Sequence, residues 1–361
     1  MEAIPLEPLR RAALRPWLLI LLTAPVLTAA LGLVAYRWQS QRQDFARMAD
    51  LFAQRQNKVL AHDATRVAEA FSHLLSEAAH DARLAASLPD DPLSYRRFFS
   101  TLAEPSSGPL YSRMIVWKKG SDLLVFEVGG PARGESRSVY RCLANPHCDR
   151  ATLEAGWALR EGFAKVGKGL RWYTPQTEPV GLSDEGSLSV VYRAGSKVIL
   201  LAVDFRSFNP ILRLPTFPYQ QKRDLLQDYE DGNYIYLLDQ DADLLAHPRR
   251  WHVMGLDRET GLPVPPMRTD ADAGSHPLNF RRYREGKLRP YFDRLIAHSF
   301  QTGEVDVFQA SNLSGQARVI SVAPVQLDPA VFDQSGPFGY VGVGCALEHF
   351  QEPEERLVPY Y

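Results

Sequence analysis

The chain has 361 residues, of which 45% are hydrophobic and 23% are charged. This composition is typical of globular proteins, and the length is sufficient for two compact domains with extensions. The formal net charge of −1 gives no reason to expect nucleic acid as a partner, because proteins that bind the phosphate backbone need a basic surface.

The first predicted element is an apolar segment near the N-terminus. Residues 1–15 carry three arginines and are predicted to be cytoplasmic, whereas residues 16–36 contain no charged residue. About 20 apolar residues, at about 1.5 Å each, span the core of a bilayer, so residues 16–36 are predicted to form a transmembrane helix. A cleaved signal peptide is the alternative, but the apolar run is longer than the roughly 7–15 apolar residues usual in such peptides.

A long stalk helix is predicted over residues 37–88. Neither proline nor glycine occurs from Gln39 to Ala86, and apolar residues recur at helical spacing between Phe45 and Ala78. The stripe is not a clean heptad repeat, so a strict coiled coil is not predicted. We expect this helix either to pair with the same helix of a second copy of the chain or to pack along the globular part of its own chain.

A first α+β module is predicted over residues 89–205. The stretch Asp90 to Pro92 ends the stalk helix, and strands in hairpins with one inserted helix follow. This order indicates an antiparallel sheet with helices on one side, the layout of a PAS-like module. The predicted strands are residues 113–118, 123–128, 171–174, 188–193 and 198–205, and the predicted helix is residues 153–166.

A second module is predicted over residues 233–350, after a linker at residues 206–232 that is rich in proline and charge. It repeats the order of elements in the first module. Its opening stretch runs from Tyr234 through a short polar turn to Pro248, and the two apolar halves predict a β-hairpin.

The turn of this hairpin carries Asp239, Asp241 and Asp243, the carboxylate spacing that opens a calcium loop of the EF-hand type. Leu244 stands where that loop needs glycine, and Arg250 stands where it needs a bidentate glutamate. Calcium is therefore rejected, and the sequence predicts no metal and no cofactor.

The order of residues in the hairpin, YIYLLDxDxxLLAHP, resembles the first hairpin of the membrane-proximal module in double Cache domains. Those domains are extracytoplasmic ligand-binding regions of bacterial receptors. Ala242 departs from the family pattern, which usually has glycine there, so the turn cannot rely on the freedom of glycine at positive φ. The resemblance covers nearly the whole chain after the apolar segment, and it implies an α+β fold with a transmembrane helix, a stalk helix and two PAS-like antiparallel-sheet modules.

The resemblance also implies a function. The chain would be the ligand-sensing region of a receptor in the bacterial inner membrane, single-pass, with its bulk in the periplasm and residues 351–361 as a C-terminal segment. Its partners would be a small polar metabolite, with an amino acid or amine favoured, a second copy of the chain, and a cytoplasmic output domain or signalling protein. The signal would be a population shift between two arrangements of the stalk.

Ligands of this family generally bind in the membrane-distal module. Amino-acid-binding members resemble one another in an Arg-x-Trp-Tyr segment and a later aspartate. Here Arg171, Trp172, Tyr173 and Asp204 resemble that set, with a spacing that departs by one residue. Arginine suits a ligand carboxylate, while aromatic rings and a carboxylate suit an ammonium group.

Tyr192 and Arg193 are further ligand candidates from the adjoining strand. Because side chains alternate along a strand, Arg171 and Trp172 are expected on opposite faces of the sheet. The aromatic pair at 172–173 is equally well explained as core, and Asp204 as the cap of a linker helix.

Cys142 and Cys148 enclose the turn-forming stretch Leu-Ala-Asn-Pro-His, which lets two thiols meet, and a disulfide is predicted between them. A metal site is the less favoured alternative, because only His147 is at hand as a further ligand. Cys345 lies in a predicted apolar strand.

Catalysis is not expected, because the chain has no nucleophile elbow, phosphate-binding loop or zinc-protease motif. Two other classes of function stay open. One is a structural or protein-interaction module without a small ligand, and the least favoured is an exported enzyme.

Overall fold

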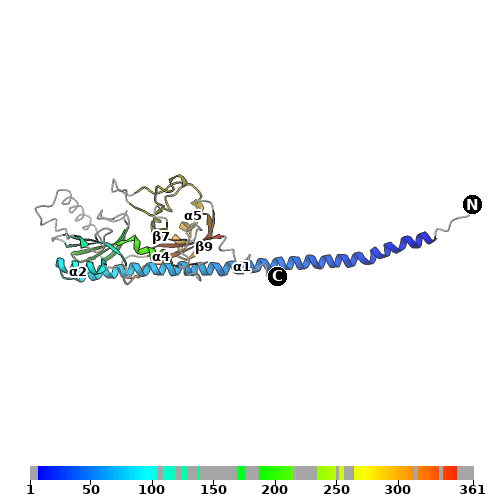
Figure 1. Ribbon diagram of the computed structural model, residues 1–361, viewed down its shortest axis with the longest axis horizontal. Coiled ribbons are helices and arrows are strands. Elements are labelled where there is room, and N and C mark those ends of the chain that lie inside the picture. Colours follow the sequence, from blue (N-terminus) through cyan, green and yellow to red (C-terminus); the bar gives the residue numbers. More distant parts are fainter. Residues whose placement is uncertain are drawn as a thin grey trace, which may run out of the picture. The chain divides into compact units, whose positions relative to one another are not determined.

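A computed structural model gives the structure of the chain. The residues that it describes are 7–103, 109–118, 123–128, 136–137, 169–174, 187–214, 216, 234–248, 252–255, 264–311, 316–332 and 336–347. The chain divides into two units, Met1–Gln56 and Asn57–Tyr361. Helix α1 (Glu7–Ser87) runs through the first unit and into the second (Figure 1).

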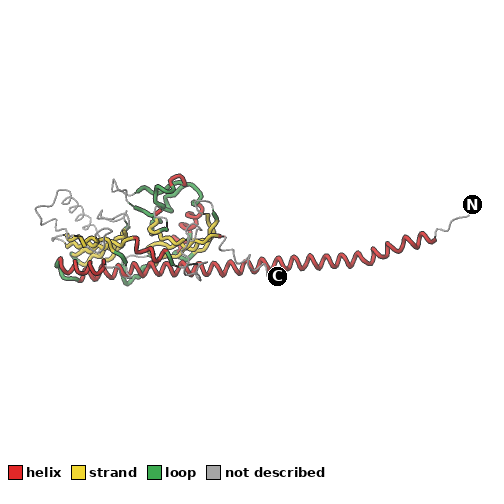
Figure 2. The backbone as a smooth tube through the Cα atoms, viewed as in Figure 1, coloured by secondary structure: helices red, strands yellow, loops and turns green. Residues whose placement is uncertain are grey.

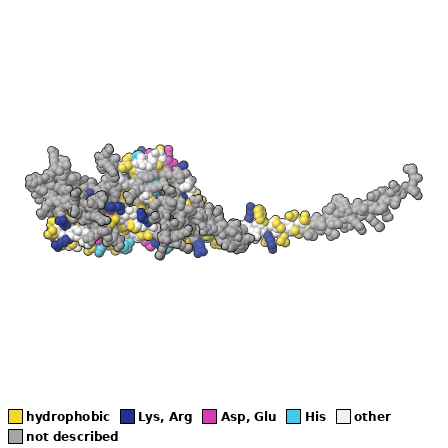
Figure 3. All heavy atoms as spheres, viewed as in Figure 1, with side chains coloured by type: hydrophobic (Ala, Val, Ile, Leu, Met, Phe, Trp, Pro, Cys, Tyr) yellow, Lys and Arg dark blue, Asp and Glu magenta, His cyan; other side chains and the backbone are white. Residues whose placement is uncertain are grey.

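Helix α1 exposes apolar side chains within the first unit. Leu27 is 67% exposed and Tyr36 is 73% exposed, and Figure 3 shows hydrophobic and basic side chains mixed along this part of the helix. In the part of the chain that the structure describes, no helix is long and apolar enough to cross a membrane. The prediction of a transmembrane helix over residues 16–36 is therefore wrong.

The first of two antiparallel sheets has the strand order β3-β2-β1-β6-β5-β4 among the described strands. Strand β6 pairs with β1 on one side and with β5 on the other, and β4 is an edge strand that pairs with β5. The strands are β1 (Tyr111–Lys118), β2 (Leu123–Val128), β3 (Ser136–Arg137), β4 (Gly169–Tyr173), β5 (Ser187–Ala194) and β6 (Lys197–Asp204). Helix α2 (Pro92–Ala103) lies beside the end of α1 (Figure 1).

The second sheet has the described order β8-β7-β11-β10-β9, again antiparallel. Both groups of strands lie along the same helix within the second unit (Figure 2). The strands are β7 (Tyr234–Asp239), β8 (Leu244–Ala246), β9 (Asp306–Ser311), β10 (Ala317–Gln326) and β11 (Pro337–Ala346). The other helices in the described part of the second unit are η1 (Phe205–Phe208) and α4 (Asn209–Leu212), which follow β6, and η5 (Asp270–Asp272), α5 (Arg289–Ala297) and α6 (Ser299–Thr302), which lie between β8 and β9 in the chain.

One face of each sheet packs against helix α1. The buried stripe of this helix is rich in alanine, and small side chains let a helix approach a sheet closely. Phe71, in the middle of the stripe, packs edge-on against Phe208 with ring centroids 5.4 Å apart. The fully buried members of the stripe are Leu60, Ala64, Val67, Phe71, Leu75, Ala78, Ala79, Ala82 and Ala85.

A charged cluster holds the end of helix α1. Lys197 Nζ donates to the carbonyl oxygens of Ala86 and Leu88, at 3.0 Å each, and the last carbonyls of a helix have no partner within the helix itself. Asp90 pairs with Lys118 at 2.6 Å and with Lys197 at 2.5 Å, and these hydrogen bonds lower the pKa of Asp90 well below its ordinary value. The predicted end of the stalk helix is thus also a tertiary contact to β6.

Hydrogen bonds to the carboxyl group of Asp239 shape the β7–β8 hairpin. Asp239 Oδ1 accepts from the backbone N–H groups of Asp241 and Asp243, both at 2.9 Å. Asn279 Nδ2 donates to Asp243 Oδ1 at 2.6 Å, which fastens the following loop to the turn. These carboxylates therefore bind the protein's own donors.

Ala242 has φ +66°, the left-handed conformation that glycine adopts freely, and its side chain is fully buried. We expect Ala242→Gly to change the free energy of unfolding by less than about 1 kcal/mol, because relief of strain and loss of a buried methyl group offset each other. Ala242→Val is expected to destabilise by about 2 kcal/mol or more, since β-branched residues rarely adopt positive φ. Urea unfolding of both variants tests this, and a valine variant as stable as the wild type contradicts it.

Two predictions concern residues outside the described part of the chain. These are the Cys142–Cys148 disulfide and the helix at residues 153–166. Cys345 is described, and it lies buried in β11.

Candidate functional site

The pleat of the first sheet separates the predicted ligand residues into two groups. Trp172 is 6% exposed and belongs to the apolar cluster around helix α1. Tyr192 packs against the same cluster, and the guanidinium carbon of Arg83 lies 5.9 Å from its ring centroid. Both aromatic side chains therefore lie on the α1 side of the sheet.

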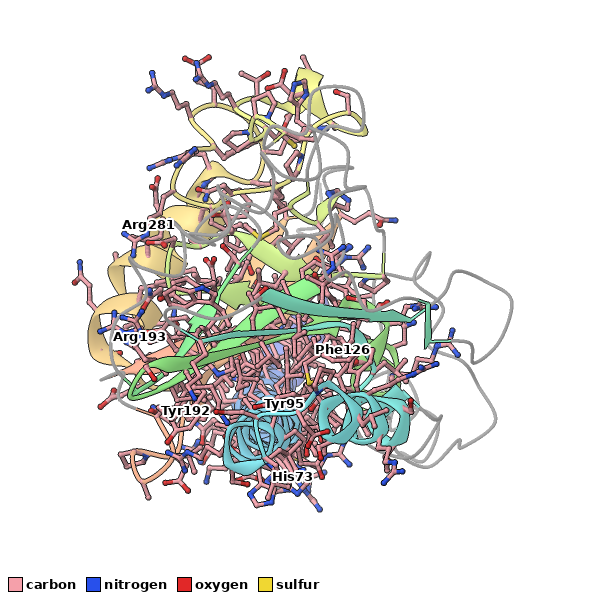
Figure 4. The ribbon with its side chains drawn as sticks, turned by 90° about the vertical axis from the view of Figure 1, so that its left-hand side faces the viewer. His73, Tyr95, Phe126, Tyr192, Arg193 and Arg281 are labelled. Atoms are coloured by element: carbon pink, nitrogen blue, oxygen red, sulfur yellow. The ribbon has the colours of Figure 1, made fainter. Side chains whose placement is uncertain are left out.

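Arg171, Tyr173 and Arg193 lie on the other face, because side chains alternate along β4 and β5. Figure 4 shows Tyr192 on the side of the sheet where the helices run and Arg193 away from it. Burial raises the pKa of Tyr173, and the positive charges of Arg171 and Arg193 act in the opposite direction. Both guanidinium groups therefore lie close enough to influence this phenol.

An apolar floor lies between the polar residues of this face. Tyr173 packs against it, and its position next to two guanidinium groups places charge beside apolar surface. Arg171 is exposed and Arg193 and Tyr173 are half-buried, so the charges lie at the solvent-accessible edge of this floor. The buried members of the floor are Ile115, Trp117, Val191, Val198, Leu200 and Ala202.

Asp204 lies at the end of β6 and is the N-cap of helix η1. Its Oδ1 accepts from the backbone N–H of Arg206 at 2.7 Å, and its Oδ2 pairs with the Arg206 guanidinium at 2.6 Å. The cap that the sequence offered as an alternative is thus present. Any ligand ammonium at Asp204 has to share this carboxylate with Arg206.

Two serines of β5 also face this side, and sequence reasoning did not select them. Ser187 is 1% exposed, and its hydroxyl has no hydrogen-bond partner among the described residues. In the strand register, Ser187 lies opposite Asp204 of β6, and Ser189 lies opposite Tyr173 of β4. A buried hydroxyl without a partner costs about 1–3 kcal/mol, so the Ser187 hydroxyl is a candidate to bind a ligand group. The only signal in the sequence was the alternation of serine with Leu188 and Val190.

The face can bind a small anion by its donors and its charge. Two guanidinium groups can form paired hydrogen bonds to one carboxylate, and a protonated phenol can donate a further bond. In the described part of the chain, no group of three His, Cys, Asp or Glu residues is placed to hold a metal ion.

Comparison with known proteins returned only structural matches: no family model and no curated protein matches the chain. It is similar to the ligand-binding domain of the Pseudomonas fluorescens chemoreceptor CtaA in complex with L-isoleucine, at 9% identity and a TM-score of 0.45, over 85% of this chain and 98% of that one. It is also similar to the periplasmic sensory domain of the Campylobacter jejuni chemoreceptor Tlp1, at 10% identity and a TM-score of 0.39, over 86% and 94% of the two chains.

A third similar structure is the ligand-binding domain of the Pseudomonas aeruginosa amino acid chemoreceptor PctC in complex with GABA. The identity is 15% and the TM-score is 0.39, over 80% of this chain and 99% of that one. All three are ligand-binding or sensory domains of chemoreceptors.

Proposed function

We propose that this chain is the periplasmic ligand-sensing region of a signalling receptor and that it binds a small metabolite with a carboxylate, an amino acid above all. The site we propose is the face of the first sheet that points away from helix α1. One observation carries the proposal. Arg171, Arg193 and Tyr173 share that face beside an apolar floor, both arginine charges act on the Tyr173 phenol, and the buried Ser187 hydroxyl, two residues from the position level with Tyr173, lacks a partner among the described residues.

Each group has a distinct part in this proposal. The two guanidinium groups bind the carboxylate, for which arginine has the matching planar geometry. Tyr173 donates a hydrogen bond, because its raised pKa keeps the phenol protonated at neutral pH. Ser187 and Asp204 lie across from each other at the opposite end of the face, four or more residues along β5 from the positions level with the arginines, so they would contact only a polar group remote from the bound carboxylate.

The experiment is a thermal-shift screen of the purified full chain against amino acids, organic acids and amines, followed by calorimetric titration. We expect hits among compounds with a carboxylate and none among simple diamines such as putrescine. Arg171→Met and Arg193→Met are each expected to weaken binding about 10- to 100-fold, since a hydrogen bond to a charged group contributes roughly 1.5–3 kcal/mol.

The matched control is Arg97→Met, which removes an exposed arginine from helix α2 of the same module. It is expected to leave the affinity unchanged. A screen without any carboxylate hit favours the structural or protein-interaction alternative. Equal affinity in wild type, Arg171→Met and Arg193→Met places the ligand elsewhere.

A further inference from the structure

The connection between β10 and β11 of the second sheet reaches the first sheet. Phe332 lies in this connection and Phe338 at the start of β11, and both pack on Trp172 of β4. The ring centroids are 6.1 Å and 5.9 Å from that of Trp172. The three side chains are 3%, 8% and 6% exposed, so the contact is buried.

Helix α1 and local hydrogen bonds hold this connection in place. Ser72 Oγ donates to the carbonyl oxygen of Gln326 at 2.5 Å, and the Arg83 guanidinium donates to the carbonyl oxygen of Val331. The backbone N–H of Phe332 donates to the carbonyl oxygen of Asp328 at 3.0 Å. Phe332 is therefore presented to Trp172 from a supported loop.

Strand β4 has few other partners. It is an edge strand, so its backbone is hydrogen bonded to β5 alone among the described strands. The indole N–H of Trp172 is buried and has no partner among the described residues. Ring packing rather than a hydrogen bond therefore holds this side chain in place. The two phenylalanine rings therefore contact one of the two β4 side chains, Leu170 and Trp172, that pack into the apolar cluster on the α1 side.

Trp172 lies between Arg171 and Tyr173 in the sequence, with its side chain on the opposite face. A shift of β4 that moves the tryptophan therefore moves both neighbours on the other side. We infer that Phe332 and Phe338 position strand β4 through Trp172, so that the second sheet sets the affinity of the ligand site on the first. The affinity part of this inference rests on the proposed function, and the positioning part does not.

Linkage requires the coupling to act in both directions. If the packing of Trp172 on Phe332 and Phe338 changes the affinity for a ligand by some factor, then bound ligand must favour that packing by the same factor. Ligand binding on the first sheet would then stabilise the β10–β11 connection of the second sheet.

The positioning part is tested without any ligand. Hydrogen exchange of the full chain would be followed by mass spectrometry for wild type, Phe332→Leu and Phe126→Leu. Phe126 is a matched control, because it is buried on the α1 side of the same sheet but lies in β2, next to Phe99 rather than Trp172. We expect Phe332→Leu to speed exchange of the amides at residues 169–173 about tenfold or more relative to those of β5.

Phe126→Leu is expected to leave that ratio unchanged while it lowers the global stability by a similar amount. Unchanged exchange of β4 in Phe332→Leu, or an equal change in both variants, would overturn the inference. Trp172→Phe keeps an aromatic ring in contact with the two phenylalanines and is expected to retain most of the protection of the β4 amides from exchange.

The affinity part uses L-alanine and succinate as probes in calorimetric titrations. Phe332→Leu is expected to weaken the binding of either probe about five- to tenfold, with Phe126→Leu within twofold of wild type. Equal affinity in Phe332→Leu and wild type overturns the coupling. If no carboxylate binds the wild type while β4 still loosens in Phe332→Leu, the proposed function fails and the positioning role stands.

Discussion

Asp239→Asn is expected to make the protein more stable than the wild type at pH 8 and to leave its stability at pH 4 almost unchanged. Asp239 is 4% exposed, and burial raises the pKa of its carboxyl group to about 8, with the nearby charge of Asp243 adding to the shift. The folded protein therefore prefers this group neutral. Asparagine is neutral at every pH and keeps an oxygen that can accept from the backbone N–H groups of Asp241 and Asp243.

The sign follows from proton binding in the two states. The ordinary pKa of the aspartate is 3.8, so between pH 3.8 and about 8 the folded state holds a proton that the unfolded state has lost. Each pH unit in this window lowers the stability by about 1.4 kcal/mol, and the loss is complete above the folded pKa. Below pH 3.8 the group contributes no slope.

The measurement is urea unfolding of wild type and Asp239→Asn at intervals from pH 4 to pH 8. We expect the difference in unfolding free energy, variant minus wild type, to rise by at least about 2 kcal/mol across this range. Asp241→Asn is the control, since it removes an exposed carboxylate from the same turn. A parallel rise in the control, or a flat difference for Asp239→Asn, contradicts the buried neutral carboxyl.

The sequence predicted this hairpin but not the role of its first aspartate. Alternating apolar runs and the polar turn are local features, and they were sufficient for β7 and β8. The comparison with a calcium-binding loop led us to reject calcium, but it did not indicate which groups Asp239 contacts or how its carboxyl group titrates. That answer depends on how deeply Asp239 is buried and on the nearby Asp243, whose own partner Asn279 lies 36 residues further along the chain.

The site shows the same division between local and tertiary information. Alternation along β4 was enough to predict that Arg171 and Trp172 face opposite ways. Which residues of neighbouring strands share the face of Arg171 is set by the register between β4, β5 and β6. No short sequence pattern encodes that register, so Ser187 was missed and Tyr192 was grouped with Arg193 although they lie on opposite faces.

The contact of Trp172 with Phe332 and Phe338 was also outside the reach of the sequence. It joins segments more than 150 residues apart, and the phenylalanines lie in and next to a connection that has no apolar periodicity. The predicted transmembrane helix is a further correction, because no helix in the part of the chain that the structure describes is long and apolar enough to cross a membrane.

Gly342→Ala is expected to destabilise the protein by about 3 kcal/mol, among the largest effects of adding a single methyl group. Gly342 lies in β11 directly across from Tyr236 of β7. A Cβ atom at Gly342 would overlap the Tyr236 ring, which is 2% exposed and whose hydroxyl contacts that of Tyr291. The ring cannot swing away without breaking this contact.

The cause of the loss is tested by removing the ring. In the double variant Gly342→Ala with Tyr236→Leu, the added methyl group has room, so the two changes are expected to cost about 2 kcal/mol less than their sum. Gly339→Ala is the matched control in the same strand, because its Cβ would meet the backbone carbonyl oxygen of Leu238 rather than a side chain. Tyr236→Leu cannot relieve that overlap, and the free energies of the control pair should add. Urea unfolding of the five variants and the wild type decides the matter, and additive costs in both pairs would show that the Tyr236 ring is not what excludes a side chain at Gly342.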